Sequence, residues 1–183
     1  MIDTLVTIIA DQNGGKSNQI RSIFDEFELK HYYGGYPTSP NIAKKYFVHP
    51  DIDLLVRLSS WHEKNQTYDD VKKDISNGVG QPNHRYKILM PAQVSATSKL
   101  MSGEEMFIQL HSDFEIRRSF AIWLSPDRLS RTPFNVTPQM ATFLSTRRNV
   151  SALAIDSLAA HPSAAPSTNS VNARLICDLL FRT

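Results

Sequence analysis

A chain of 183 residues is long enough to form one domain with a full hydrophobic core. Its 20 basic and 18 acidic side chains give a net charge of +2, so charge alone does not indicate a nucleic-acid-binding protein. The one cysteine, Cys177, excludes an intramolecular disulfide and a cysteine-based zinc site. No apolar run approaches the roughly 20 residues that span a bilayer, and the apolar start of the chain lacks the basic residue of a signal peptide. These features predict a cytoplasmic protein without a membrane span.

The first third of the chain begins with a strand pattern and continues with a helix pattern. Residues 5–9 form a β-branched apolar run that is typical of a buried strand. Residues 17–29 carry apolar side chains at spacings of three and four, which predicts an amphipathic helix. Residues 31–51 are rich in glycine, proline and tyrosine, so we expect a loop there with a short helix near 41–46.

Strands and helices alternate in the rest of the chain. Apolar runs predict further strands at 54–58, 86–90, 119–124 and 152–155. Capping signals predict three helices that begin after Thr67, Ser102 and Thr137, and the last helix begins at Asn169 or Ser170. This alternation predicts an α/β fold, a three-layer αβα arrangement around a mainly parallel sheet, in a single domain of residues 1–183.

The first strand leads directly into a relaxed phosphate-binding loop. Residues 10–17 read Ala-Asp-Gln-Asn-Gly-Gly-Lys-Ser, in which a small residue is followed by four residues and then by Gly-Lys-Ser. Glycines let backbone N–H groups converge on phosphate oxygens, and the start of the next helix adds partial positive charge. We therefore predict that Asn13, Gly14, Gly15, Lys16, Ser17 and Asn18 bind a nucleotide. The alternative is a tight Gly-Gly turn with a solvated lysine.

The loop predicts a division of chemical roles. Lys16 would reach the β- and γ-phosphates as a catalytic residue, and Ser17 would bind Mg²⁺ beside ATP. Hydrolysis also needs a carboxylate near the metal, usually at the end of an apolar strand. Asp156 follows the strand at 152–155 and is the candidate, while Glu63 follows the strand at 54–58 at a longer distance. A turn or capping role for Asp156 is the alternative.

Other polar residues could contribute to a phosphate site. Arg117, Arg118, Arg128 and Arg131 flank the strand at 119–124 and could neutralise phosphate charge, or they form a solvated rim. The tyrosines at 32, 33 and 36 could stack on a base or cover a sheet edge. The triplet 61–63, Trp-His-Glu, could be a fragment of a site.

The order of these features resembles the ParA/MinD-like P-loop ATPases, including the plasmid-stability and conjugation relatives. Besides the loop, the segment Lys87-Ile-Leu-Met-Pro91 followed by Ser95 is similar to the family's apolar strand before a serine-containing loop. The segment from Arg118 to Pro126 is similar to the strand that supports the adenine base. The resemblance covers most of the chain and implies a P-loop fold, bound ATP and a dimeric ATPase switch in DNA partition, transfer or positioning.

Three positions depart from that family. Asp11 stands where the family has an additional lysine, no carboxylate follows directly after Leu58, and the segment 122–126 has no base-contacting asparagine. The resemblance therefore implies nucleotide binding by Lys16 and Ser17 more directly than it implies hydrolysis. A homodimer, DNA and a DNA-bound protein are the partners that it implies, with Lys44, Lys45, Arg147 and Arg148 as candidate DNA contacts.

Two other functions remain open from the sequence. The chain has a suitable length for a small-molecule or nucleotide kinase, in which the arginines around 117–131 would close over phosphates. It could also be a non-hydrolysing α/β interaction or assembly subunit, which the missing carboxylate after Leu58 favours.

Overall fold

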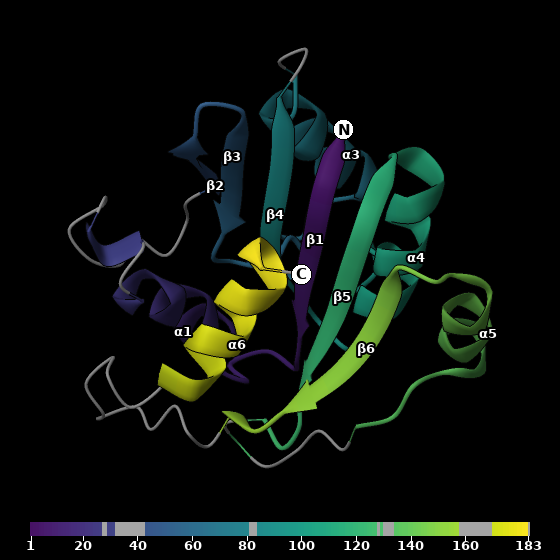
Figure 1. Ribbon diagram of the computed structural model, residues 1–183. Coiled ribbons are helices and arrows are strands. Elements are labelled where there is room, and N and C mark those ends of the chain that lie inside the picture. Colours follow the sequence, from purple (N-terminus) through teal and green to yellow (C-terminus); the bar gives the residue numbers. More distant parts are fainter. Residues whose placement is uncertain are drawn as a thin grey trace.

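The fold is a six-stranded sheet between two layers of helices, as the computed structural model in Figure 1 shows. The structure describes residues 1–26, 29–31, 43–80, 84–127, 129, 134–157 and 170–182. The sheet has the order β2-β3-β4-β1-β5-β6. Its strands are β1 (Ile2–Ile9), β2 (Ala43–His49), β3 (Ile52–Arg57), β4 (Arg85–Ala92), β5 (Ile116–Leu124) and β6 (Val150–Ile155). Strand β2 is antiparallel to β3 and the other neighbouring strands are parallel, so the predicted three-layer α/β fold is confirmed.

Helices cover both faces of the sheet. The described helices are α1 (Lys16–Ser22), α3 (Tyr68–Gly78), α4 (Gly103–Asp113), α5 (Pro138–Thr146) and α6 (Ser170–Phe181), with 3₁₀ turns η1 (Ile23–Asp25) and η2 (His62–Lys64). Helices α1 and α6 lie on one face, and α3, α4 and α5 lie on the other (Figure 1). In the described part of the chain no helix is both long enough and apolar enough to cross a membrane.

Strand β1 is buried on both faces, which explains its continuous apolar sequence. Val6 and Ile8 pack under α1 and α6, whereas Leu5 and Ile9 pack on the side of α3 and α4. The alternation follows from the two-residue period of a strand. Because β1 is a central strand, the loop that follows it emerges near the middle of the carboxyl edge of the parallel strands.

The predicted helix starts after Thr67, Ser102 and Thr137 are confirmed. Thr67 and Ser102 each form a capping box with the acidic residue three positions later, and the Thr137 hydroxyl accepts a hydrogen bond from the Met140 backbone N–H. Asn169 lies outside the described residues, and α6 begins at Ser170.

Three expectations about elements are corrected by the structure. The short helix expected near 41–46 is wrong, because strand β2 begins at Ala43 and pairs with β3. Tyr46 is buried and its ring centroid lies 4.8 Å from that of Phe24, so packing decided this segment's conformation. The helix expected over 17–29 ends at Ser22 and continues as a 3₁₀ turn. Strand β4 continues through Pro91, which pairs with Ile8.

Candidate phosphate-binding site

The loop between β1 and α1 needs both of its glycines, for different reasons. Gly15 caps α1 with φ of 98°, a left-handed conformation that side chains disfavour. At Gly14 an added Cβ would lie 2.9 Å from the Ala10 Cβ and 2.9 Å from the Asp11 carbonyl oxygen. Asn13 also has a positive φ, of 63°, which asparagine tolerates better than most residues. The loop therefore has a conformation that the Asn-Gly-Gly sequence specifically permits.

This loop lines a half-open cavity of about 160 Å³. The cavity is lined by all six loop residues predicted to bind a nucleotide and by one further residue, Glu63: Asn13, Gly14, Gly15, Lys16, Ser17, Asn18 and Glu63. Its volume leaves room for several water molecules. That is smaller than the roughly 300–1,000 Å³ of pockets that enclose a whole drug-sized ligand. The size suits a polar group such as a phosphate chain.

Lys16 lies across the loop and is only 4% exposed. Its Nζ donates to the carbonyl oxygens of Ala10 at 3.1 Å and Asp11 at 2.7 Å. The same Nζ lies 3.8 Å from Glu63 Oε1. The ammonium group is thus held at the wall of the cavity by loop carbonyls and one carboxylate, where it can attract a bound anion.

Ser17 connects the loop to the neighbouring part of the sheet. Its Oγ donates to the Leu58 carbonyl oxygen at 2.8 Å, one residue beyond the end of β3. A hydroxyl that donates one hydrogen bond still has lone pairs that can bind a cation. Ser17 is therefore suited to the metal-binding role that the sequence predicts, and it joins β1's loop to the segment that carries Glu63.

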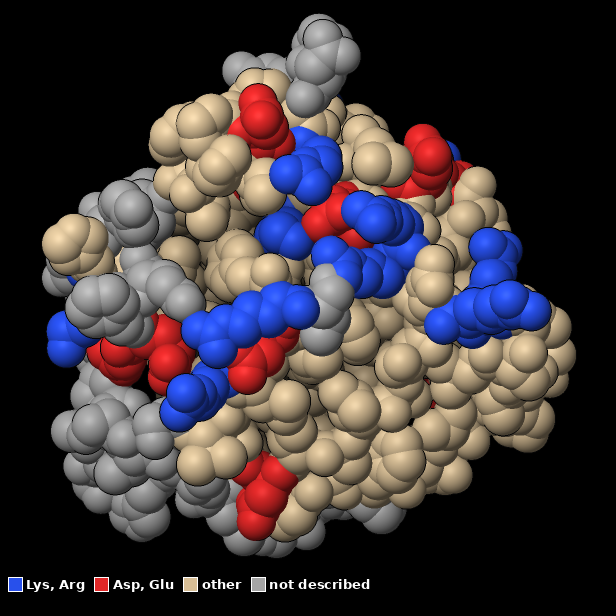
Figure 2. Space-filling view, viewed as in Figure 1, with Lys and Arg blue, Asp and Glu red and all other residues tan. Residues whose placement is uncertain are grey.

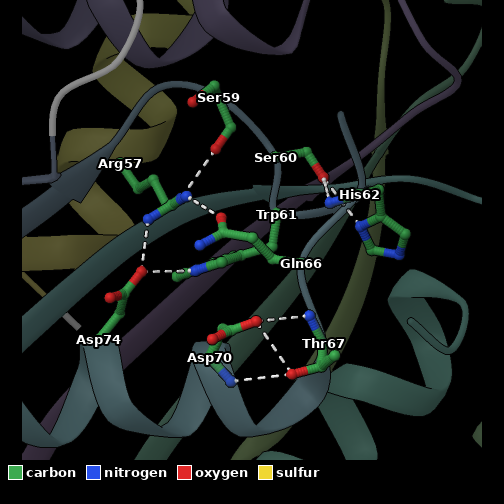
Figure 3. A network of polar contacts seen from close by, with 9 residues as sticks. All are labelled: Arg57, Ser59, Ser60, Trp61, His62, Gln66, Thr67, Asp70 and Asp74. Carbon is green, nitrogen blue, oxygen red and sulfur yellow. Dashed lines mark hydrogen bonds and ion pairs between the residues drawn. The ribbon is translucent and has the colours of Figure 1, made fainter. Parts of the chain in front are cut away.

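The segment after β3 is held by a network around Arg57 (Figure 3). The Arg57 guanidinium donates to Asp74 at 2.7 Å, to Gln66 at 2.8 Å and to the Ser59 carbonyl oxygen at 2.9 Å. It also lies over the ring of Trp61, at 4.0 Å from the centroid, and the Trp61 indole N–H donates to Asp74. Burial lowers the pKa of Arg57 and Asp74 opposes that effect. These contacts fix residues 57–66 and so position Glu63.

His62 fastens the same segment to the β4–α4 connection. Its Nε2 lies 2.8 Å from the Met101 carbonyl oxygen, and a carbonyl only accepts, so Nε2 carries the proton. Its Nδ1 then accepts from the Ser60 hydroxyl at 2.8 Å. Burial lowers the pKa of His62, the bond to Met101 opposes this, and the charge of Lys16 adds to the lowering. The neutral imidazole has a structural role, because it links the segment that carries Glu63 to the β4–α4 connection.

Asp127 is a residue near the site that the sequence reasoning missed. It follows β5 after a cis Ser125–Pro126 peptide bond and is fully buried. Its Oδ1 accepts from the Leu129 backbone N–H at 3.1 Å, and its Oδ2 lies 3.1 Å from where a Cβ on Gly14 would be. Asp127 thus packs against the loop from the β5 side. The available signal was the Ser-Pro-Asp turn at the end of a strand next to β1.

The structure separates Asp156 from the loop residues. Asp156 is exposed at the end of β6, with β5 between β6 and β1, and it does not line the cavity. Its carbonyl oxygen accepts from Asn172 of α6, which also donates to Gln19 of α1. Of the two strand-end carboxylates considered from sequence, the structure brings Glu63 to the cavity. Within the described residues, no group of three or more His, Cys, Asp or Glu side chains could hold a metal ion by itself.

The other predicted contributors that the structure describes do not line the cavity. Arg117 and Arg118 lie at the start of β5, whereas the loop lies at the opposite end of the sheet. Arg128, Arg131 and the tyrosines at 32, 33 and 36 lie outside the described residues, as does the Lys44 side chain. Lys45 pairs with Asp53 at 2.9 Å, and Arg147 lies over the Phe143 ring.

Comparisons with known proteins give no match: no protein-family model, no curated protein and no solved structure corresponds to this chain.

Proposed function

We propose that this protein binds the phosphate chain of a nucleoside triphosphate, ATP with Mg²⁺, in the cavity of the loop at 10–17. The observation that carries this proposal is a polar cavity of about 160 Å³ in which a buried lysine faces glycine-rich backbone. A buried ammonium group that donates to loop carbonyls can exchange those contacts for phosphate oxygens. The nucleoside would extend outside the cavity, which is too small to enclose it.

Each residue at the cavity has a distinct task in this proposal. Lys16 binds phosphate, Ser17 binds Mg²⁺ through its hydroxyl, and the loop backbone surrounds the phosphate chain. Glu63 replaces Asp156 as our candidate for the carboxylate beside the metal, because it lines the cavity and Asp156 does not. A bound Mg²⁺ would offset the repulsion between Glu63 and phosphate.

We extend the proposal to the switch function of the ParA/MinD-like ATPases, in DNA partition, transfer or positioning. The support is the bond from Ser17 to Leu58, which joins the loop to the segment 58–66. When Ser17 binds a metal, this segment would adjust, and the surface around it could change its affinity for a second subunit. A cytoplasmic location fits a chain whose one cysteine, Cys177, is buried and donates its thiol hydrogen to the Ile23 carbonyl oxygen.

The test is calorimetric titration of ATP and GTP, with and without Mg²⁺, into wild type, Lys16→Ala and Lys72→Ala. Lys72 is a partly exposed lysine that pairs with Asp113, so its variant is a control for the loss of one positive charge. Loss of a charged hydrogen bond costs about 1.5–3 kcal/mol, so Lys16→Ala should weaken binding about 10- to 100-fold. Thermal unfolding of each variant checks that it is folded.

Two results would contradict the proposal. One is that wild type binds neither nucleotide at millimolar concentration, and the other is that folded Lys16→Ala binds as well as wild type. Phosphate release by wild type and Glu63→Gln then separates an ATPase from a non-hydrolysing nucleotide-binding subunit. Turnover that depends on Glu63 supports the ATPase, whereas binding without turnover supports the interaction subunit.

A further inference from the structure

One region of the sheet has charged side chains instead of a described covering helix. Helix α6 lies over the loop half of β1 and β4, and its C-terminal end reaches Lys87 through Phe181. On this face of the sheet no described helix lies over the ends of β1, β4 and β5 that are farthest from the loop (Figure 1). Figure 2 shows lysine and arginine side chains gathered there around acidic atoms. The basic residues are Arg85, Lys87, Arg117 and Arg118, which we call the basic patch.

A buried ion pair forms the centre of the basic patch. Strand β1 has a register shift between Ile2 and Thr4 against β4, so Asp3 is an extra residue in the ladder. Such a bulge re-aims a side chain, and Asp3 Oδ2 accepts from Lys87 Nζ at 2.7 Å. Both side chains are less than 5% exposed. Burial raises the pKa of Asp3, but the hydrogen bond and charge of Lys87 and the charge of Arg118 outweigh it and lower the pKa to about 2.

The positive charge of the arginines and Lys87 exceeds the single negative charge of Asp3. Arg117 lies 3.3 Å and Arg118 3.5 Å from the Asp3 oxygens, while Arg85 acts on Lys87 by charge. Arg117 has a side chain that is 59% exposed, and Arg85 is exposed as well. The Arg118 Nε is buried and has no hydrogen-bond partner. Asp3 therefore faces three cations, Arg85 adds a further positive charge near Lys87, and the guanidinium groups keep donors for an external anion.

The surroundings of the basic patch favour a short acidic segment over a long polyanion. Glu115 directly precedes β5, and its carbonyl oxygen accepts from the Ile2 N–H. Asp51 lies next to the start of β4, and its carbonyl oxygen accepts from the Arg85 N–H. Because both residues are exposed and acidic, they limit the length of the positive region, which suits a short segment better than a long nucleic-acid backbone. The ring centroid of Phe181 in α6 lies 5.8 Å from Lys87 Nζ, and Phe120 is half-buried. Apolar surface is therefore present beside the charged groups.

We propose that the basic patch docks an acidic, partly apolar segment of a partner protein. Arginine forks match carboxylates in a bidentate manner, and the exposed side chains of Arg85 and Arg117 can offer such forks to one segment. The basic patch lies at the opposite end of the sheet from the loop at 10–17, so docking there is independent of the nucleotide site.

The experiment measures fluorescence anisotropy of a labelled peptide that alternates glutamate with phenylalanine and alanine. Its counterpart with glutamine in place of glutamate and a labelled DNA duplex are the comparison probes, all at low and at physiological salt. The proteins are wild type, the double variant Arg85→Gln/Arg117→Gln and the control Arg147→Gln/Arg148→Gln. The first pair leaves Lys87 and Arg118 on Asp3, and the control makes the same charge change at the end of α5.

We expect wild type and the control to bind the acidic peptide and to bind the glutamine peptide at least about threefold more weakly. The basic-patch variant should lose at least about threefold in affinity for the acidic peptide, and higher salt should reduce the difference. Equal binding of the acidic peptide by both double variants would overturn the proposal, as would no binding by wild type. Tighter binding of DNA that is lost in the basic-patch variant would also overturn it in favour of nucleic acid.

Discussion

Replacing Gly14 with alanine should lower both the stability of the protein and its affinity for a nucleotide. The added Cβ would lie 2.9 Å from the Ala10 Cβ, whereas carbon atoms pack best at about 3.5–4.0 Å. It would also lie 2.9 Å from the Asp11 carbonyl oxygen and 3.1 Å from Asp127 Oδ2. Two of these neighbours are backbone or Cβ atoms that no rotamer change can move, so the loop itself must shift by about half an ångström or more.

The expected cost follows from the usual range for overpacking, about 1–3 kcal/mol. For a chain of this length each kcal/mol lowers Tm by about 2–4 °C, so Tm should fall by about 2–12 °C. The same shift would move the loop away from the Lys16 ammonium, and ATP affinity should fall about tenfold or more. Differential scanning calorimetry and ATP titration measure the two effects.

Gly80→Ala is the matched control for this substitution. The nearest atoms to a Cβ at Gly80 are the carbonyl oxygens of Ser76 at 3.6 Å and Asn77 at 4.0 Å, which are ordinary contacts. Its Tm and ATP affinity should stay near those of wild type. If Gly14→Ala had the same Tm and ATP affinity as Gly80→Ala, the close packing around Gly14 would affect neither stability nor nucleotide binding.

Three other substitutions test the site and the fold. Glu63→Gln should raise affinity for metal-free ATP about two- to fivefold, because it removes a partly exposed carboxylate from the cavity, and calorimetry should show a smaller gain from Mg²⁺. Arg57→Gln should reduce the free energy of unfolding in urea by about 2–3 kcal/mol, because Asp74 loses a charged donor. Asp3→Asn should flatten the acid dependence of stability: the lowered pKa of Asp3 provides about 2 kcal/mol that is present above pH 3.8 and lost as the pH falls toward 2.

An exposed arginine provides the control for Arg57→Gln. Arg148→Gln should change the free energy of unfolding by less than about 0.5 kcal/mol, against which the Arg57 effect is judged. An Asp3→Asn protein with the same stability change between pH 4 and pH 2 as wild type would contradict the assignment of that titration to Asp3. Unchanged ATP affinity in Glu63→Gln, with and without Mg²⁺, would remove Glu63 from the site.

Local chemistry determined much of the fold. The β-branched run of β1 specifies a strand because both of its faces are apolar, and the glycines at 14 and 15 end it with a turn that few other residues allow. Thr67 and Ser102 specify helix starts because their hydroxyls bond to backbone groups three residues away. Interactions of this short range can be recognised in a single sequence.

Tertiary structure decided the features that depend on residues far apart in the chain. Residues 43–49 form a strand because β3 pairs with them and Phe24 packs on Tyr46, neither of which is visible in the local pattern. Glu63 faces the loop because the Arg57 network folds the segment after β3 back toward β1. The pairing of Asp3 with Lys87 spans 84 positions and needs a bulge.

The sequence by itself therefore determined the alternation of strands and helices and the loop that lines the cavity. It did not determine which carboxylate stands beside that loop or where the basic patch forms. Those depend on the order of strands in the sheet, which places β3 and β5 on either side of the β4–β1 pair. Strand order is set by the burial of both faces of the sheet together, a property of the whole chain that no local segment encodes.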